Sequence, residues 1–203
     1  MNFPPMLRSS LRSIQLLGIV SSDLLKSRGV NVFLKTFIDD LILLRDGLSL
    51  NIRNEERIWF GILLHFIGDM PASNFVGGLK EGVGFARLPC RSCMIVRTDQ
   101  ETIHHESNCI LRNQIIHEQH VLQIENASEI SQASKDTMSS NYGINRRSPF
   151  DRLGYFDSTK CFMHDLMHVV PEGVLNDCSA LLLQYLILDP VIKLNLVDVI
   201  AKF

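Results

Sequence analysis

The chain has no apolar run long enough to cross a lipid bilayer. Its longest such runs, residues 58–68 and 180–188, fall well short of the ~20 residues that a helical span requires. Neither sign of charge dominates, because 20 Lys and Arg stand against 22 Asp and Glu, and the pI is near 6.4. We therefore expect no transmembrane helix and no membrane partner, and any DNA binding must come from a local basic patch.

Cysteine is too scarce, and its number is odd, for a secreted scaffold held together by disulfides. There are five, and Cys90 and Cys93 have the Cys-x-x-Cys spacing of a metal site. The apolar stretch 14–20 follows Arg8 and Arg12 and superficially resembles a secretory signal, but the same stretch also reads as a β-strand. We therefore expect a reducing compartment, the nucleus or the cytoplasm.

A hydrophobic content of 46% predicts a folded chain with a sizeable core. Apolar residues spaced three and four apart predict a helix that Asn31 caps and Gly47 ends. Residues 48–52 and 58–68 read as strands, so the order of elements indicates an α/β or α+β fold. Residues 127–141 are polar and rich in serine, which predicts an exposed, mobile linker.

Single acids stand at two places where they can carry chemistry. Asp69 directly follows the apolar run, where open α/β sheets place catalytic groups, so its carboxylate is suited to hold a divalent cation. The alternative is a cap for a helix that starts near Met70 with Pro71 in its first turn. Asp165 and His168 lie three apart and can orient a metal-bound group; the alternative is an acid at the positive end of a helix.

The thiols of Cys90 and Cys93 can grip one zinc ion, and a structural site then needs two further ligands. Two histidine pairs have suitable helical spacing: His117 with His120, and His164 with His168. We predict His117 and His120 as the ligands, and the alternative is a pair of buried thiols without metal. Farther along, Arg146 and Arg147 suit phosphate contact, although paired arginines are also typical of a solvated surface.

Five segments, read in order, are more specific together than any one alone: GDMPASN, GGLKEGVGFA, CRSC, YGINRRS and DLMHVVPEGV. From Phe3 to about Asp189 the chain resembles the catalytic region of CACTA (En/Spm)-like DDE transposases and their Kyakuja, Dileera and Zisupton relatives. The resemblance implies an α/β fold, with a partial ribonuclease-H-like core whose sheet is incomplete and a helical, zinc-binding insertion. It also implies three acids that hold Mg²⁺ or Mn²⁺ for cleavage and transfer of DNA strands.

The resemblance assigns Asp69 as the second of these acids, Cys90 and Cys93 to the Cys-x-x-Cys insertion, and Asp165 with His168 to an Asp-x-x-His motif. It divides the chain into three parts: a partial core in 1–80, a Cys/His insertion in 81–160 with the polar linker 127–141, and a helical segment in 161–203 that starts with the Asp-x-x-His motif. The first acid is expected before Phe3 and the last beyond Phe203.

We therefore expect a transposase fragment that is catalytically incompetent alone, since metal-assisted strand transfer requires converging carboxylates. The parent family acts on transposon DNA ends, and the incomplete sheet predicts self-association through its exposed edge. One alternative is a zinc-stabilised DNA-binding or protein-interaction module retained after loss of catalysis. Another is a nuclease in which Asp69, Asp165 and Glu172 form a compact triad.

Overall fold

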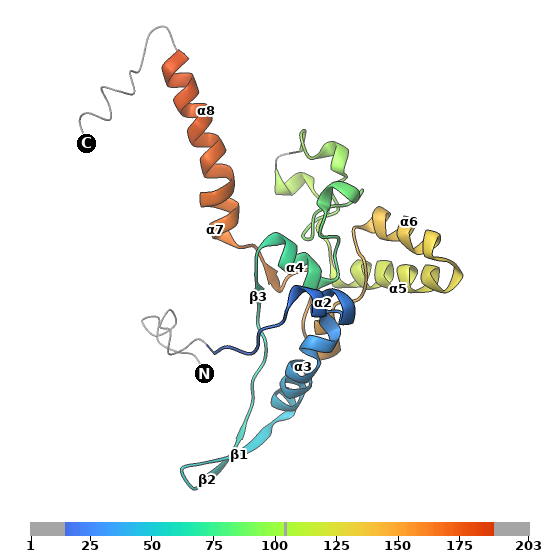
Figure 1. Ribbon diagram of the computed structural model, residues 1–203, viewed down its shortest axis with the longest axis vertical. Helices are drawn as coiled ribbons and strands as arrows, with labels where there is room; N and C mark the ends of the chain where they lie inside the picture. The colour runs from blue at the N-terminus through green and yellow to red at the C-terminus, as the bar shows by residue number, and fades with distance from the viewer. Residues whose placement is uncertain (1–14, 104, 189–203) are drawn as a thin grey trace, which may run out of the picture.

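The computed structural model describes residues 15–103 and 105–188 (Figure 1). This part of the chain is mixed α/β, mostly helical, with two small two-stranded sheets. The helices are α2 (Ser22–Arg28), α3 (Val30–Asp46), α4 (Met70–Gly77), α5 (Gln114–Ile130), α6 (Gln132–Tyr142), α7 (Leu166–Val169) and α8 (Leu175–Leu188). The strands are β1 (Leu48–Ile52), β2 (Glu55–Trp59), β3 (Phe66–Ile67) and β4 (Phe162–Met163).

The first two helices begin and end close to where local chemistry predicts. The Ser21 side chain accepts the N–H of Leu24 at the start of α2, and Gly29 ends that helix. Helix α3 starts immediately after Gly29, not after a cap at Asn31, and ends at Gly47 as predicted. The strand expected from residues 14–20 is absent from the described residues 15–20, and Ile14 lies outside them.

One hydrophobic core joins segments that are far apart in the chain. Its buried members are Val30, Ile38, Val76, Phe150, Leu153, Phe156 and Phe162. The rings of Phe150, Phe156 and Phe162 pack in tilted or edge-on arrangements with centroids 5.0 to 6.1 Å apart, which suits the charge distribution of aromatic rings. Residues 1–80, 81–160 and 161–203 therefore all contribute to the same core.

The single strand predicted for residues 58–68 is divided. Its start belongs to β2, which forms an antiparallel hairpin with β1, and its end is β3, which pairs in parallel with β4. Between them the chain follows the end of α3, because Gly61 donates its N–H to the Leu44 carbonyl at 3.0 Å. A Cβ on Gly61 would stand only 2.3 Å from Leu44 Cδ2, so any larger residue here would require the Leu44 side chain to move. Within the described residues, β3 and β4 each keep one edge without a strand partner.

The stretch 127–141, predicted as a mobile linker, is helical. Ser131 separates α5 from α6, and its hydroxyl accepts the N–H of Ser134 at 3.1 Å to cap α6. The two helices pack side by side, with Met138 and Tyr142 of α6 against the buried cluster around Val121 of α5. Only this narrow face of α6 is apolar, so the serine-rich composition marks a solvated helix face and the linker prediction was wrong.

The C-terminal described helices form an arm that projects from the rest of the molecule (Figure 1). A π-helical turn, η6 (Val170–Val174), lies between α7 and α8 and accommodates Pro171, which has no N–H to donate. No residue of α8 is buried. Among the described residues, no helix combines the length and the apolar character needed to cross a membrane.

Candidate functional site

The parallel pairing of β3 with β4 brings two predicted acids to the same end of one sheet. Ile67 is the register partner of Met163. Asp69 and Asp165 each follow two residues later, so both carboxylates emerge just beyond the carboxyl ends of neighbouring parallel strands. We call Asp69, Asp165 and His168 the acidic corner.

Each acid also caps the helix that follows its strand. Asp69 Oδ1 accepts the N–H of Ala72 at 2.7 Å, and Asp165 Oδ1 accepts the N–H of Met167 at 2.9 Å. The cap predicted as an alternative for Asp69 is therefore confirmed. Capping occupies one oxygen of each carboxylate, and the second oxygen of Asp69 has no hydrogen-bond partner among the described residues. Asp69 and Asp165 are both half-buried, which leaves them open to small ligands.

His168 stands among the carboxylates of the acidic corner. Its Nδ1 lies 2.9 Å from Asp165 Oδ2, and its Nε2 lies 3.5 Å from Glu172 Oε2. The hydrogen bond to Asp165 raises the pKa of His168, and the charges of Glu172, Asp165 and Asp69 add to this effect. The same hydrogen bond lowers the pKa of Asp165. One imidazole thus lies among three carboxylates, whose combined negative charge favours cations.

The donor atoms of the acidic corner fit a hard cation. Magnesium and manganese prefer carboxylate oxygens, and magnesium retains several waters when only one or two carboxylates bind it. In the described part of the chain, no three His, Cys, Asp or Glu side chains converge closely enough to hold a metal. Two carboxylates, Asp69 and Asp165, would leave most coordination positions of such a cation to water.

Cys90 and Cys93 lie in a second element, which we call the cysteine ribbon: residues 90–95 with residues 109–112 antiparallel to them. Cys93 bridges to Leu111, and Met94 donates its N–H to the Ile110 carbonyl at 2.7 Å. The ribbon contacts the residue that precedes Asp165, since Ser92 Oγ lies 3.2 Å from His164 Nε2. A cavity of about 200 Å³ is lined by Cys90 and Arg91 of the ribbon and by Met70 and His164, which adjoin Asp69 and Asp165 in the chain.

Burial and the neighbouring Cys90 thiol change the acidity of Cys93. Burial raises the pKa of the Cys93 thiol to about 11, and a hydrogen bond with Cys90 acts in the same direction. An N–H from Ile95 opposes this effect. Without a bound cation, Cys93 is therefore a neutral thiol at physiological pH.

The structure does not bring His117 and His120 to the cysteines. Both lie on α5, where His117 is buried and its two ring nitrogens have no hydrogen-bond partner. Burial lowers the pKa of His117 to about 4. His120 stacks on Tyr142, with ring centroids 3.9 Å apart. His120 thus belongs to the packing between α5 and α6, and His117 is buried elsewhere on the same helix.

Arg146 and Arg147 serve the fold and do not face solvent as a phosphate-binding pair. Arg146 donates to the Phe75 carbonyl and lies over the Phe75 ring, 5.4 Å from its centroid. Arg147 forms ion pairs with Glu118 at 2.7 Å and Glu125 at 3.0 Å. Both side chains are thus occupied, Arg146 with α4 and Arg147 with α5.

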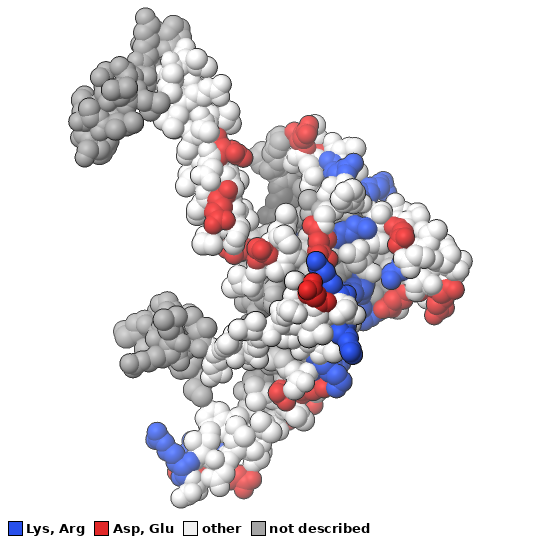
Figure 2. All heavy atoms as spheres, viewed as in Figure 1, with Lys and Arg blue, Asp and Glu red and all other residues white. Residues whose placement is uncertain are grey.

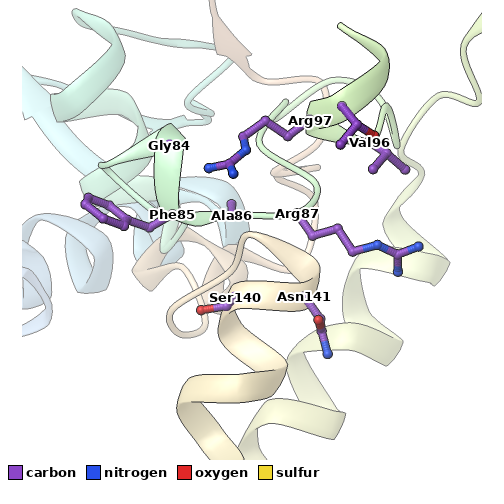
Figure 3. A pocket seen from close by; sticks show the side chains of 9 residues that line it. Gly84, Phe85, Ala86, Arg87, Val96, Arg97, Ser140 and Asn141 are labelled. Carbon is purple, nitrogen blue, oxygen red and sulfur yellow. The ribbon is translucent and has the colours of Figure 1, made fainter.

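Two other arginines, which sequence reasoning missed, line a cavity of about 330 Å³ between residues 84–87, 96–98 and α6. Figure 3 shows Arg97 extending toward Phe85 and Arg87 extending away from it, above Ser140 and Asn141. Neither joins the ion pairs of the described residues, unlike Arg147 and Arg152. Figure 2 shows Lys and Arg interspersed with Asp and Glu on this side of the molecule, whereas the α7–α8 arm shows Asp and Glu but no Lys or Arg. No motif marks this pair, since residues 87 and 97 meet only through backbone pairing.

Comparison with known proteins gives no relative: no family model matches the chain, and neither a curated protein nor a solved structure does.

Proposed function

We propose that this chain is part of the catalytic region of a DNA transposase, and that its acidic corner binds Mg²⁺ or Mn²⁺ for phosphoryl transfer on DNA. The observation that carries this proposal is the β3–β4 register, which delivers Asp69 and Asp165 to one sheet edge from positions almost a hundred residues apart. Helices capped by the same acids hold both side chains in place. Carboxylates at the ends of adjacent parallel strands are suited to metal chemistry.

The residues of the acidic corner have separable roles in this proposal. Asp69 and Asp165 are the carboxylates that hold the cation, which when bound activates the attacking or the leaving oxygen of a phosphodiester. His168 is a positioning residue, because its hydrogen bond at 2.9 Å fixes the orientation of the Asp165 carboxylate. Two carboxylates are fewer than the three of the resembled family, so we expect metal binding without strand cleavage by this chain alone.

DNA is the proposed partner. Its proposed phosphate contacts are the guanidiniums of Arg87 and Arg97, which join no ion pair among the residues that the structure describes. Their positions on either side of one cavity suit two phosphates of a single strand (Figure 3). The neighbouring Phe85 is 81% exposed and offers a surface on which a base can stack.

Manganese binding tests the acidic corner. Electron paramagnetic resonance of Mn²⁺ titrated with the folded chain should show a bound fraction that Asp69→Asn reduces at least about tenfold, since the amide is a weaker ligand. Asp23→Asn, at the start of α2, is the matched control and should bind as the wild type does. The proposal fails if the wild type binds no Mn²⁺, or if Asp69→Asn binds it as well as the control.

A second candidate function is a DNA-binding module without catalysis, which the Arg87 and Arg97 cavity favours. It predicts binding of single-stranded DNA that weakens steeply with salt, with a shallower salt dependence in Arg87→Ala and Arg97→Ala. Fluorescence anisotropy measures both. Salt-dependent DNA binding in a chain that binds no Mn²⁺ would select this candidate over the first.

A further inference from the structure

We propose that the cavity beside the cysteine ribbon binds inorganic phosphate. This cavity of about 200 Å³, which we call the Arg91 cavity, is lined among others by Asn74, Cys90, Arg91, Gln100 and His164. None of these side chains takes part in the proposed binding of metal or DNA, so the inference does not depend on the proposed function. It follows from an uncompensated buried charge and an unpartnered buried acceptor in the cavity wall.

Arg91 brings a positive charge to the cavity that no carboxylate in the described part of the chain compensates. Arg91 is 7% exposed and joins none of the ion pairs between described residues. Its Nη2 donates to the Met163 carbonyl at 2.9 Å, whereas Nε and Nη1 have no hydrogen-bond partner. A buried charge without a counter-charge destabilises a fold, so an anion in the adjoining cavity would be stabilising.

A second buried guanidinium adds to this positive charge. Arg112 is 4% exposed, and its Nε donates to the carbonyl of Cys90, a residue of the cavity wall, at 2.7 Å. Arg112 likewise joins no ion pair with a described carboxylate. Two neighbouring cations favour an anion of higher charge, such as phosphate, over a carboxylate with a single charge.

Asn74 distinguishes among the oxyanions. Asn74 is 2% exposed, and its Nδ2 donates to the Lys80 carbonyl at 3.0 Å. Because only the amide nitrogen can donate, this bond fixes the orientation of the amide and leaves Oδ1 as an acceptor without a partner. A matching ligand therefore carries an O–H donor besides its acceptor oxygens. Inorganic phosphate keeps at least one O–H group at neutral pH, whereas sulfate, carboxylates and phosphodiesters have none there.

His164 and Gln100 offer further donors to the same ligand. His164 Nε2 lies 3.2 Å from the Ser92 hydroxyl, and when this hydroxyl donates, the ring proton resides on Nδ1 as an additional donor. Gln100 is exposed and lines the cavity with its amide. The cavity is smaller than the ~300 Å³ at which pockets for drug-sized ligands begin, which favours a small occupant such as phosphate.

Calorimetric titration of the full chain with inorganic phosphate, in EDTA at neutral pH, tests this assignment. We expect saturable binding of about one phosphate per chain and at least about tenfold weaker binding of sulfate, which cannot donate to Asn74. Arg91→Gln should weaken phosphate binding at least about tenfold. Arg57→Gln, the matched control at an exposed arginine of β2, should bind as the wild type does. EDTA removes divalent cations, so this measurement does not depend on metal binding at the acidic corner.

Alkylation of the unmodified sequence gives a second readout, which does not depend on how the variants fold. Cys90 lines the cavity, whereas Cys178 is exposed on α8. Saturating phosphate should slow the reaction of iodoacetamide with Cys90 several-fold and leave the rate at Cys178 unchanged. Sulfate at the same concentration should leave both rates unchanged.

Four results would overturn the proposal. They are no binding of phosphate by the wild type, binding of sulfate as tight as that of phosphate, binding of phosphate by Arg91→Gln as tight as by Arg57→Gln, and no protection of Cys90 by phosphate.

Discussion

The acidic corner and the cysteine ribbon lie near each other but differ in how strongly the fold depends on their side chains. In the corner, Asp69 and Asp165 use one oxygen to cap a helix and keep solvent-accessible surface. In the ribbon, Arg112 is buried and donates to the carbonyls of Cys90, Leu88 and Tyr142 at 2.7 to 2.9 Å. The corner thus leaves the second oxygen of Asp69 without a partner among the described residues, whereas the fold depends on the hydrogen bonds of the ribbon.

This difference predicts where substitutions act. Changes in the ribbon and in the loops packed against it should lower stability, and changes in the corner should alter ligand binding at nearly constant stability. Four substitutions, taken from the largest expected effect to the smallest, test this division.

Arg112→Met should have the largest effect. It keeps the length of the side chain but leaves three carbonyls in or near the core without a donor, so we expect the free energy of unfolding to fall by about 4 kcal/mol. Urea unfolding followed by circular dichroism measures it. Arg97→Met removes an exposed guanidinium and should change stability by less than about 0.5 kcal/mol. If both variants lost the same free energy of unfolding, the ribbon would contribute no more to stability than the surface does.

Gly143→Ala should be the next most damaging. Gly143 has φ 71°, and an added Cβ would lie 2.2 Å from the Leu88 carbonyl oxygen, inside the backbone that supports the ribbon. The left-handed conformation and the clash together should cost about 2 to 3 kcal/mol. Gly84→Ala is the control, because a Cβ there meets nothing within 4 Å. A Gly143→Ala chain as stable as this control would show that the loop can move away from Leu88.

His117 should make stability depend on pH. Burial lowers its pKa to about 4 in the folded chain, against an ordinary value of 6.5 in the unfolded chain. The unfolded state therefore binds the extra proton, so stability from the neutral imidazole is complete above pH 6.5 and is lost as the pH falls toward 4. Between pH 7 and 5 we expect a loss of about 2 kcal/mol.

His117→Leu separates this residue from the other titrating groups. The substitution removes two buried nitrogens that have no partner, so the variant should be at least as stable as the wild type at pH 7 and should lose most of the decline toward pH 5. Urea midpoints measured across this range provide the comparison. An unchanged decline in the variant would assign the pH dependence to another group.

Asp69→Asn should have the smallest effect on stability. Asparagine caps helices about as well as aspartate, so the bond to Ala72 persists and we expect a change of less than about 0.5 kcal/mol. If this variant remains folded but binds Mn²⁺ more weakly, the substitution acts on metal binding and not on stability. Asp69→Ala, which also removes the cap, should cost about 1 kcal/mol in the same unfolding assay.

Local patterns predicted the local parts of this fold. Helix α3 with its end at Gly47, the strand β1, and the position of Asp69 between a strand and a helix all follow from spacing and capping chemistry. Residues 127–141 show the limit of composition, because a helix with one narrow apolar face has nearly the composition of a linker.

The parts of the candidate site that sequence could not predict are its long-range contacts. β3 and β4 are two residues each, too short to give a periodic signal, yet their pairing unites Asp69 with Asp165. The contact of Cys93 with Leu111 likewise depends on antiparallel pairing of separate segments. Arg112 and Arg146 stabilise the fold by donating to carbonyls of distant segments, and no local sequence pattern predicts these hydrogen bonds.

The π-helical turn at Pro171 determines how far α8 is rotated about its own axis relative to α7. A π turn contains one residue more than an α turn, and each helical residue rotates the side-chain direction by about 100°. The leucine-rich side of α8 therefore faces about 100° away from the direction it would take as an unbroken continuation of α7. Deleting one residue from 170–174 would swing that side around the helix axis while leaving the caps at Asp69 and Asp165 untouched. The direction in which the leucines of α8 point is thus determined by residues that precede α8.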